Sequence, residues 1–302
     1  MWEKHIEDFR QYLKLERGLT DNSVMAYTRD LRKLTECLTE MGKADIEPKD
    51  VTPQDFSEFV SWLGRKKVAE RTQSRIMSGV RTFYKSLIIS EEIEADPTES
   101  VQAPRIGRKL PTVLSVAEID AMEETFAKDT MDGVRNLAMI EVLYSCGLRV
   151  SELTNLRLIN LRFSKGYITV VGKGRKERMI PIGERAKNCV LRYLREFRET
   201  VDILPAYRDY VFINKLGTTI SRIMVFNIVR EAAQAAGITK HVSPHTLRHS
   251  FATHLVDGGA NLRAVQQMLG HESIVTTEIY THLDNTYLKT TLLDHHPYKG
   301  DK

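Results

Sequence analysis

The feature that most constrains the fold is a stretch without helical or strand periodicity in the first half of the chain. Residues 95–112, ADPTESVQAPRIGRKLPT, carry three prolines and a basic cluster. Proline interrupts helices and sheets because it lacks a backbone N–H and fixes φ, so this stretch predicts a linker. A chain of 302 residues is long enough for two domains. We therefore predict an N-terminal domain over 1–95, a linker over 96–111 and a C-terminal domain over 112–302.

The N-terminal domain has the pattern of four helices. Amphipathic periodicity and capping residues predict them over 3–17, 20–40, 52–63 and 71–89. In the last of these helices, at roughly 100° per residue, a basic arc lies opposite an apolar arc. This arc and the linker supply predicted phosphate contacts, which are Arg71, Arg75, Arg81, Lys85, Arg105, Arg108 and Lys109. The alternatives are a solvated helix face and an exposed tether, since most charge stripes only face water.

The C-terminal domain is predicted to be mainly α-helical with a small sheet. The helical pattern covers 116–127, 132–145, 183–200, 219–236, 244–257, 261–268 and 273–281. Between residues 160 and 182 the period changes to two, and the strand-like runs GYITVV and ERMIPI are joined by the glycine-bearing turn GKGRK. We predict a mainly α fold with a small three-stranded antiparallel sheet in this domain. A tail over about 283–302 keeps leucines at partly helical spacing, and we expect it to dock on another subunit.

Composition narrows the class of protein without defining it. The net charge of +4 is small, but residues 65–85 hold seven basic side chains against one acidic. No apolar run of about eighteen residues occurs and the N-terminus is charged, so we expect no membrane segment and a cytoplasmic location. The three cysteines are odd in number and widely spaced, which favours buried thiols over disulfides or a metal site.

The strongest candidate for chemistry is the segment HTLRHSFATH, residues 245–254, which follows a Ser-Pro helix start. Proline is favoured in the first helical turn, so His245 and Arg248, three residues apart, project from one face of that turn. A helix N-terminus favours anions such as phosphate because its first backbone N–H groups lack partners. The pair is therefore predicted to act on one phosphate, whereas a single helical histidine would more often be a capping or core residue.

A metal site is the alternative interpretation of this segment. His245 and His249 are four residues apart, which is the spacing of zinc hydrolases of the HExxH type. Thr246 stands where that motif needs glutamate, and nothing nearby supplies a convincing third ligand. We therefore predict neither a metal nor a cofactor.

Arginine and lysine side chains upstream are candidates for the same phosphate. Arg149 lies in CGLRVSEL, just after Gly147 ends a helix, and its planar fork can donate two parallel hydrogen bonds to phosphate oxygens. A surface arginine paired with Glu152 is the alternative. Lys173 lies at the tip of the predicted hairpin, where an ammonium can donate a proton to a leaving oxygen. Arg175 shares this turn and is a further predicted DNA contact.

Downstream, the LGH triplet ends at His271, and Tyr280 follows nine residues later. This order brings an imidazole, a guanidinium, a second imidazole and a phenol into reach of one phosphate. Tyr287 is the only serious rival as nucleophile, but it lacks the spacing from LGH.

On these motifs the chain resembles the tyrosine recombinases, and within them the Xer recombinases. The resemblance runs over nearly the whole length, from a SAM-like core-binding domain to the catalytic domain, and GLRVSEL and LLDHHP favour the Xer group. It implies a metal- and ATP-independent DNA strand transferase that forms a 3′-phosphotyrosyl link and a Holliday junction and resolves chromosome dimers. The implied catalytic residues are Arg149, Lys173, His245, Arg248, His271 and the nucleophile Tyr280.

The resemblance also implies partners. These are double-stranded DNA, a DNA-bound tetramer formed with itself or a Xer paralogue, and an FtsK-type DNA translocase. A mobile-element integrase shares this chemistry and differs in the DNA site it binds, and a type IB topoisomerase uses a similar set of residues. A catalytically idle DNA-binding accessory protein is the alternative from another class, although it would have little reason to keep all six residues.

Overall fold

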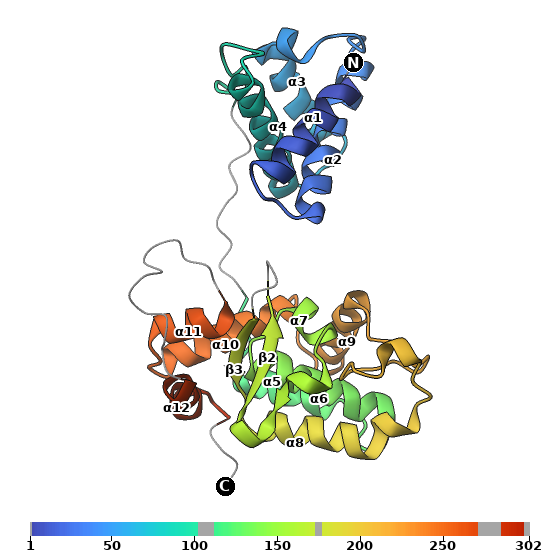
Figure 1. Ribbon diagram of the computed structural model, residues 1–302, viewed down its shortest axis with the longest axis vertical. Coiled ribbons are helices and arrows are strands. Elements are labelled where there is room, and N and C mark those ends of the chain that lie inside the picture. Colours follow the sequence, from blue (N-terminus) through green and yellow to red (C-terminus); the bar gives the residue numbers. More distant parts are fainter. Residues whose placement is uncertain (1, 102–111, 173–176, 271–284, 299–302) are drawn as a thin grey trace. The chain divides into compact units, whose positions relative to one another are not determined.

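The computed structural model describes residues 2–101, 112–172, 177–270 and 285–298. The chain divides into two compact units, Met1–Lys109 and Leu110–Lys302, which Figure 1 shows in full. The predicted fold class is confirmed: the chain is mainly helical, and its small antiparallel sheet lies in the C-terminal unit.

The N-terminal unit consists of helices packed around an aromatic core. They are α1 (Trp2–Leu15), α2 (Asp21–Glu40), the 3-10 turn η1 (Pro48–Asp50), α3 (Pro53–Arg65) and α4 (Glu70–Ile89). Thr52 caps α3 by forming a capping box with Asp55, which satisfies backbone N–H groups at the helix start. Phe83 of α4 lies edge-on to Phe9 of α1 with ring centres 5.3 Å apart. Burial of such large rings gives this small unit much of its stability.

Residues 96–101, which were predicted as linker, pack with the N-terminal unit. Asp96 Oδ1 accepts the backbone N–H and the hydroxyl of Thr98 at 2.8 and 2.6 Å. Thr98 and Val101 are buried, and Arg81 Nη2 donates to the carbonyl of Val101 at 2.5 Å. The unit therefore extends past the predicted boundary at residue 95, because a segment without periodicity can still bury individual side chains.

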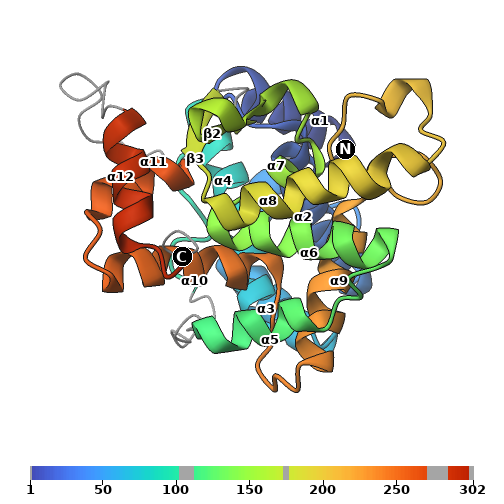
Figure 2. The same ribbon diagram turned by 90° about the horizontal axis from the view of Figure 1, so that it is seen from below.

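The C-terminal unit is organised around α6, whose residues from Ala138 onward are all buried. Its helices are α5 (Val116–Glu124), α6 (Met131–Ser145), α7 (Val150–Thr154), α8 (Glu184–Arg192), α9 (Arg222–Ala235), α10 (Pro244–Asp257), α11 (Leu262–Leu269) and α12 (Asn285–His295). Helices α6 and α8 lie side by side in both views (Figures 1 and 2). The helix predicted over 183–200 is α-helical only to Arg192. Beyond it lie a π-helical turn, η5 (Tyr193–Phe197), and a 3-10 turn, η6 (Arg198–Thr200).

The sheet is antiparallel with strand order β1-β2-β3. Its strands are β1 (Leu161–Arg162), β2 (Tyr167–Val171) and β3 (Glu177–Pro181), and short 3-10 turns occur at Leu158–Asn160, Phe163–Lys165 and Pro205–Tyr207. Ile168 and Ile180 are paired across β2 and β3, and both are buried. The period of two in the sequence thus reflects one face packed on the helices.

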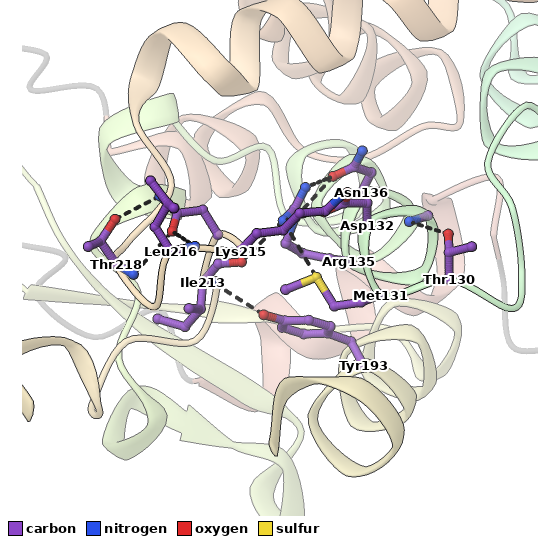
Figure 3. Close-up of polar contacts among 12 residues, drawn as sticks. Thr130, Met131, Asp132, Arg135, Asn136, Tyr193, Ile213, Lys215, Leu216 and Thr218 are labelled. Carbon is purple, nitrogen blue, oxygen red and sulfur yellow. Dashed lines mark hydrogen bonds and ion pairs between the residues drawn. The ribbon is translucent and has the colours of Figure 1, made fainter. Parts of the chain in front are cut away.

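A buried arginine fastens α6 to a distant loop of the same unit (Figure 3). Arg135 is 1% exposed, forms an ion pair with Asp132 at 2.8 Å, and donates to the carbonyl of Ile213 at 3.2 Å. The backbone N–H of Ile213 donates to the hydroxyl of Tyr193 at 3.1 Å, and Lys215 pairs with Asp132 at 2.6 Å. These contacts tie together α6, η5 and the loop that precedes α9.

The C-terminal helix packs on its own unit. Leu288 and Leu292 of α12 are buried, and α12 contacts β3, α10 and α11. Beyond it, burial lowers the pKa of His296 to about 3, and the hydroxyl of Tyr298 donates to Asp120 at 2.7 Å. Two of the leucines expected to dock on another subunit, Leu288 and Leu292, are therefore buried in cis in this structure, whereas Leu293 is exposed. The helix predicted over 273–281 lies outside the described residues.

The cysteines are free thiols, and burial raises the pKa of Cys37, Cys146 and Cys189. In the described part of the chain, no helix combines the length and apolar character needed to cross a membrane.

Candidate active site

The turn that carries Arg149 depends on a glycine. Helix α6 ends at Ser145 and is capped by Cys146, and Gly147 has φ +57°, a left-handed conformation that costs other residues free energy. A Cβ at this position would lie 2.5 Å from the ring of Phe251, so the space is also closed to a side chain. Gly147 thus reverses the chain tightly and leaves Arg149 directly before α7, as the sequence predicted.

Arg149 is paired with Glu152, but the pair is not a surface one. The carboxylate of Glu152 is buried, and it accepts the Arg149 backbone N–H at 2.8 Å and Arg149 Nη1 at 2.9 Å. Arg149 itself is one-third exposed, so part of its guanidinium faces solvent. Arg178 and Arg149 hold the pKa of Glu152 below its usual range, against the effect of burial. Glu152 is therefore a fixed negative charge that orients Arg149.

Arg248 lies next to this pair. It is 7% exposed, and it donates to the carbonyls of Gly147 and Leu269, each at 2.5 Å. Its Nη1 is 3.9 Å from the carboxylate of Glu152. Burial lowers the pKa of Arg248 to about 10, and the positive charge of Arg149 adds to this shift. The two predicted arginines therefore do converge, at the start of α7 and the first turn of α10.

His245 lies in the same first turn of α10 as Arg248. Ser243 and Thr246 form a capping box that fixes the start of this helix. His245 is exposed, whereas Arg248 is buried, so the imidazole faces solvent beside the arginine pair. The structure describes these parts of the site only: Lys173, Arg175, His271 and Tyr280 lie outside the described residues.

Arg178 in β3 also belongs to this site, and it was not predicted from the sequence. Both of its terminal nitrogens donate to Glu152, at 2.7 and 2.9 Å, and its Nε donates to the carbonyl of Met268 at 2.9 Å. Nothing in the strand pattern distinguishes this arginine from a surface residue, since its partner is 26 positions away. The role of Glu152 had one local signal, its position three residues after Arg149.

The predicted phosphate contacts on α4 divide into two kinds. Arg71 and Lys85 are exposed. Arg75 is also exposed, at 51% of its side chain, but it forms a two-point ion pair with the buried carboxylate of Asp30, at 2.6 and 2.8 Å. The half-buried Arg81 donates to a backbone carbonyl. Two of the four side chains are thus committed to internal contacts. Arg105, Arg108 and Lys109 lie outside the described residues.

The histidines considered as zinc ligands do not form a cluster with other ligand types. Over the described ranges, no three side chains of His, Cys, Asp or Glu are grouped as a metal would require. His254 Nδ1 is hydrogen-bonded to the hydroxyl of Tyr144 at 2.8 Å.

Comparison with known proteins identifies the family of the chain. The phage integrase family matches residues 112–286, and the phage integrase N-terminal SAM-like domain matches residues 6–91. The tyrosine recombinase XerD of Chlorobaculum tepidum is 40% identical over 300 residues, which are 98% of this chain and 97% of that protein. The crystal structure of XerA recombinase is 29% identical in sequence and has a TM-score of 0.50, and the match covers 98% of this chain and 99% of the XerA chain. The crystal structure of XerH site-specific recombinase bound to difH is 24% identical, with coverages of 94% and 82% and a TM-score of 0.67.

The chain therefore belongs to the phage integrase family. Within that family it is a site-specific tyrosine recombinase of the Xer type. The prediction of a Xer recombinase is thus confirmed, and the relatives favour it over a mobile-element integrase or a topoisomerase.

Proposed function

We propose that this recombinase cuts and rejoins DNA through a covalent bond to Tyr280 and resolves chromosome dimers at cell division. The observation that supports this reaction is the convergence of Arg149 and Arg248, from separate elements, around one buried glutamate. Two cations that are held rigidly close together suit a single phosphodiester, whose oxygens gain negative charge in the transition state. By analogy with an oxyanion hole, each would stabilise that state by about 2.7–4 kcal/mol.

The chemical step is an in-line displacement at phosphorus. The phenol oxygen of Tyr280 forms a bond to phosphorus while the bond from phosphorus to the 5′ oxygen breaks. Lys173 protonates that leaving oxygen, and the exposed His245 is the candidate base for the phenol proton. A phenol has a reference pKa near 10, so the surrounding positive charge, which we assign to Arg149, Arg248 and His271, favours its ionisation.

The energy of the broken bond stays in the phosphotyrosyl ester. Attack by a 5′-hydroxyl of the partner strand reverses the step, so neither ATP nor a metal is required. Two successive exchanges pass through a Holliday junction, which needs a DNA-bound tetramer formed with itself or a Xer paralogue. Solved structures of this fold include complexes with DNA, such as those of the Tn1549 transposon integrase and of XerH, which supports double-stranded DNA as the substrate. We assign the protein to the cytoplasm, where chromosomal DNA lies, and an FtsK-type translocase as a partner.

The test is capture of the covalent intermediate. A nicked duplex carrying the bound site, recovered by footprinting host genomic DNA, is incubated with protein in chelator without ATP. We expect a protein-linked DNA band that is lost in Tyr280→Phe. The matched control is Tyr287→Phe, which removes the phenol of an exposed tyrosine on α12 and should keep the band. No band from the unaltered protein, or a band that survives in Tyr280→Phe, would contradict the proposal.

A further inference from the structure

The end of α11 is held by three different guanidinium groups. Its last turn leaves backbone carbonyls without helical partners, and cations are favoured there. Three successive carbonyls each accept one hydrogen bond: Met268 from Arg178 Nε at 2.9 Å, Leu269 from Arg248 Nη2 at 2.5 Å, and Gly270 from Arg149 Nη2 at 3.1 Å. One helix end thus fixes both candidate catalytic arginines together with a third, Arg178.

Arg178 differs from the other two in how its donors are used. Nη1 and Nη2 form a two-point pair with both oxygens of Glu152, and Nε is committed to Met268. Its side chain is 14% exposed, between the 8% of Arg248 and the 33% of Arg149, so the use of its donors rather than its exposure distinguishes it. Arg178 is therefore not placed to bind phosphate, and its contacts go to groups that themselves hold Arg149 and Arg248.

Gly270 leaves the space that Arg178 occupies. It ends α11 with φ +63°, and a Cβ there would lie 3.1 Å from Arg178 Cδ and Nε. The guanidinium thus lies against the backbone of the residue that precedes His271 in the sequence. Rotation of this side chain would remove the two-point pair with Glu152 and the hydrogen bond to the carbonyl of Met268.

We propose that Arg178 is a positioning residue of the recombinase site, which neutralises Glu152 and fixes the end of α11 so that Arg149 and Arg248 are free to act on phosphate. The inference rests on the proposed function. Three guanidiniums around one carboxylate leave two net positive charges. Without Arg178, Glu152 would attract Arg149 and Arg248 more strongly, and half of the net charge would be lost.

Single-turnover cleavage of the nicked duplex, at DNA concentrations that saturate binding, tests the role. Arg178→Met removes both charge and hydrogen bonds, and we expect cleavage about 100-fold slower with the Kd for DNA within a factor of three. In the proposed reaction the phenol attacks a phosphate held by Arg149 and Arg248, so loss of one positive charge from this cluster should raise the pKa of the phenol. The pH–rate profile should then move upward by about one unit. Arg178→Lys keeps the charge but not the two-point pair, so we expect a roughly tenfold loss with an unshifted profile.

Arg198→Met is the matched control. Arg198 is also buried, but it donates to the carbonyls of Arg208 and Tyr210, and no carboxylate of the described residues is paired with it. A control variant that melts earlier but cleaves at the normal saturated rate would show that lost stability alone does not slow the reaction. If Arg178→Met fails to fold, Arg178→Lys carries the test by its slower rate.

Arg178 variants that cleave at the normal saturated rate with an unshifted profile would overturn the inference and leave the proposed function intact. Absence of a covalent product from the unaltered protein would instead overturn the proposed function, and this inference with it.

Discussion

Arg149 and Arg248 were predictable one at a time because each follows from a local rule. A glycine that ends a helix exposes Arg149, and a Ser-Pro helix start places Arg248 in a first turn. Their convergence on one phosphate was an expectation from the order of motifs, whereas their contacts with Glu152 and with the end of α11 are seen only in the structure. Arg178 could not be found in this way, since a strand arginine carries no local signal for a partner 26 residues earlier. Sequence patterns thus predict functional residues at the ends of helices better than the distant residues that fix their side chains in place.

Gly147 is predicted to be irreplaceable for packing as well as for conformation. Gly147→Ala places a methyl 2.5 Å from Phe251 and forces a left-handed φ on a residue with a Cβ. Together we expect about 3 kcal/mol of destabilisation of the catalytic unit. Gly237→Ala is the control, because Gly237 has φ +72° but open space, and about 1 kcal/mol is expected.

Both tryptophans, Trp2 and Trp62, lie in the N-terminal unit, so their fluorescence reports that unit alone. Unfolding of the catalytic unit is followed by near-ultraviolet circular dichroism of its tyrosines. Equal losses of stability in the two glycine variants would show that contact with Phe251 does not add to the cost at Gly147. A shift in the tryptophan transition would show that the substitution also affects the N-terminal unit.

At the scale of elements, α4 carries arginines of two kinds on one arc: Arg75 and Arg81 bind groups of their own unit, although Arg75 stays half exposed, whereas Arg71 is an exposed candidate for DNA contact. Asp30 of α2 is buried against Gly79 of α4, where a Cβ would lie 2.7 Å from its carboxylate, and Arg75 pairs with it at two points. Helical periodicity identified the basic arc but not the ion pair of Arg75, because its partner Asp30 lies on another helix. Burial raises the pKa of Asp30 although Arg75 opposes the shift. Arg75 therefore clamps α2 to α4.

This division predicts different effects for two neighbouring arginines. Arg71→Gln should flatten the dependence of log K for DNA on log salt by about one unit, if the exposed side chain contacts a phosphate. Arg75→Gln should leave the slope unchanged and destabilise the N-terminal unit by about 1–3 kcal/mol, since it leaves Asp30 underpartnered. Filter binding from low to high salt and tryptophan-monitored unfolding measure the two effects. A slope reduced by Arg75→Gln would place that guanidinium at the DNA instead.

At the scale of the whole molecule, the sequence predicted the order of helices and the small sheet because burial of one face imposes a regular period. Prediction from the sequence was less accurate for segments that bury individual side chains without a helical or strand periodicity. Val101 joins the N-terminal unit in this way, and His296, which follows α12, does so in the catalytic unit. The hydroxyl of Tyr298 donates a hydrogen bond to Asp120, and the guanidinium of Arg185 lies over the Tyr298 ring, 3.8 Å from its centre. Such contacts depend on the finished fold, so no local pattern announces them.

Arg185 also faces two buried acids, and this cluster sets a pH dependence. Glu123 and Glu141 are 4% and 0% exposed, and Arg185 forms ion pairs with both. Burial, with the negative charge of Glu141 added to it, raises the pKa of Glu123 to about 9. One cation cannot balance two carboxylates in this setting, so Glu123 holds a proton at neutral pH.

Between about pH 4.5 and 9, the folded state therefore keeps a proton on Glu123 that the unfolded chain has already released. Stability should fall as pH rises through that window, by at most about 1.4 kcal/mol per pH unit from this group. Glu123→Gln mimics the protonated acid, so its advantage over the unaltered protein should grow from pH 6 to pH 9. Denaturant unfolding of the catalytic unit at several pH values measures this difference. Glu124→Gln, at the exposed neighbouring position, should give a curve parallel to the unaltered protein. A parallel curve for Glu123→Gln as well would mean that Arg185 keeps both buried acids ionised.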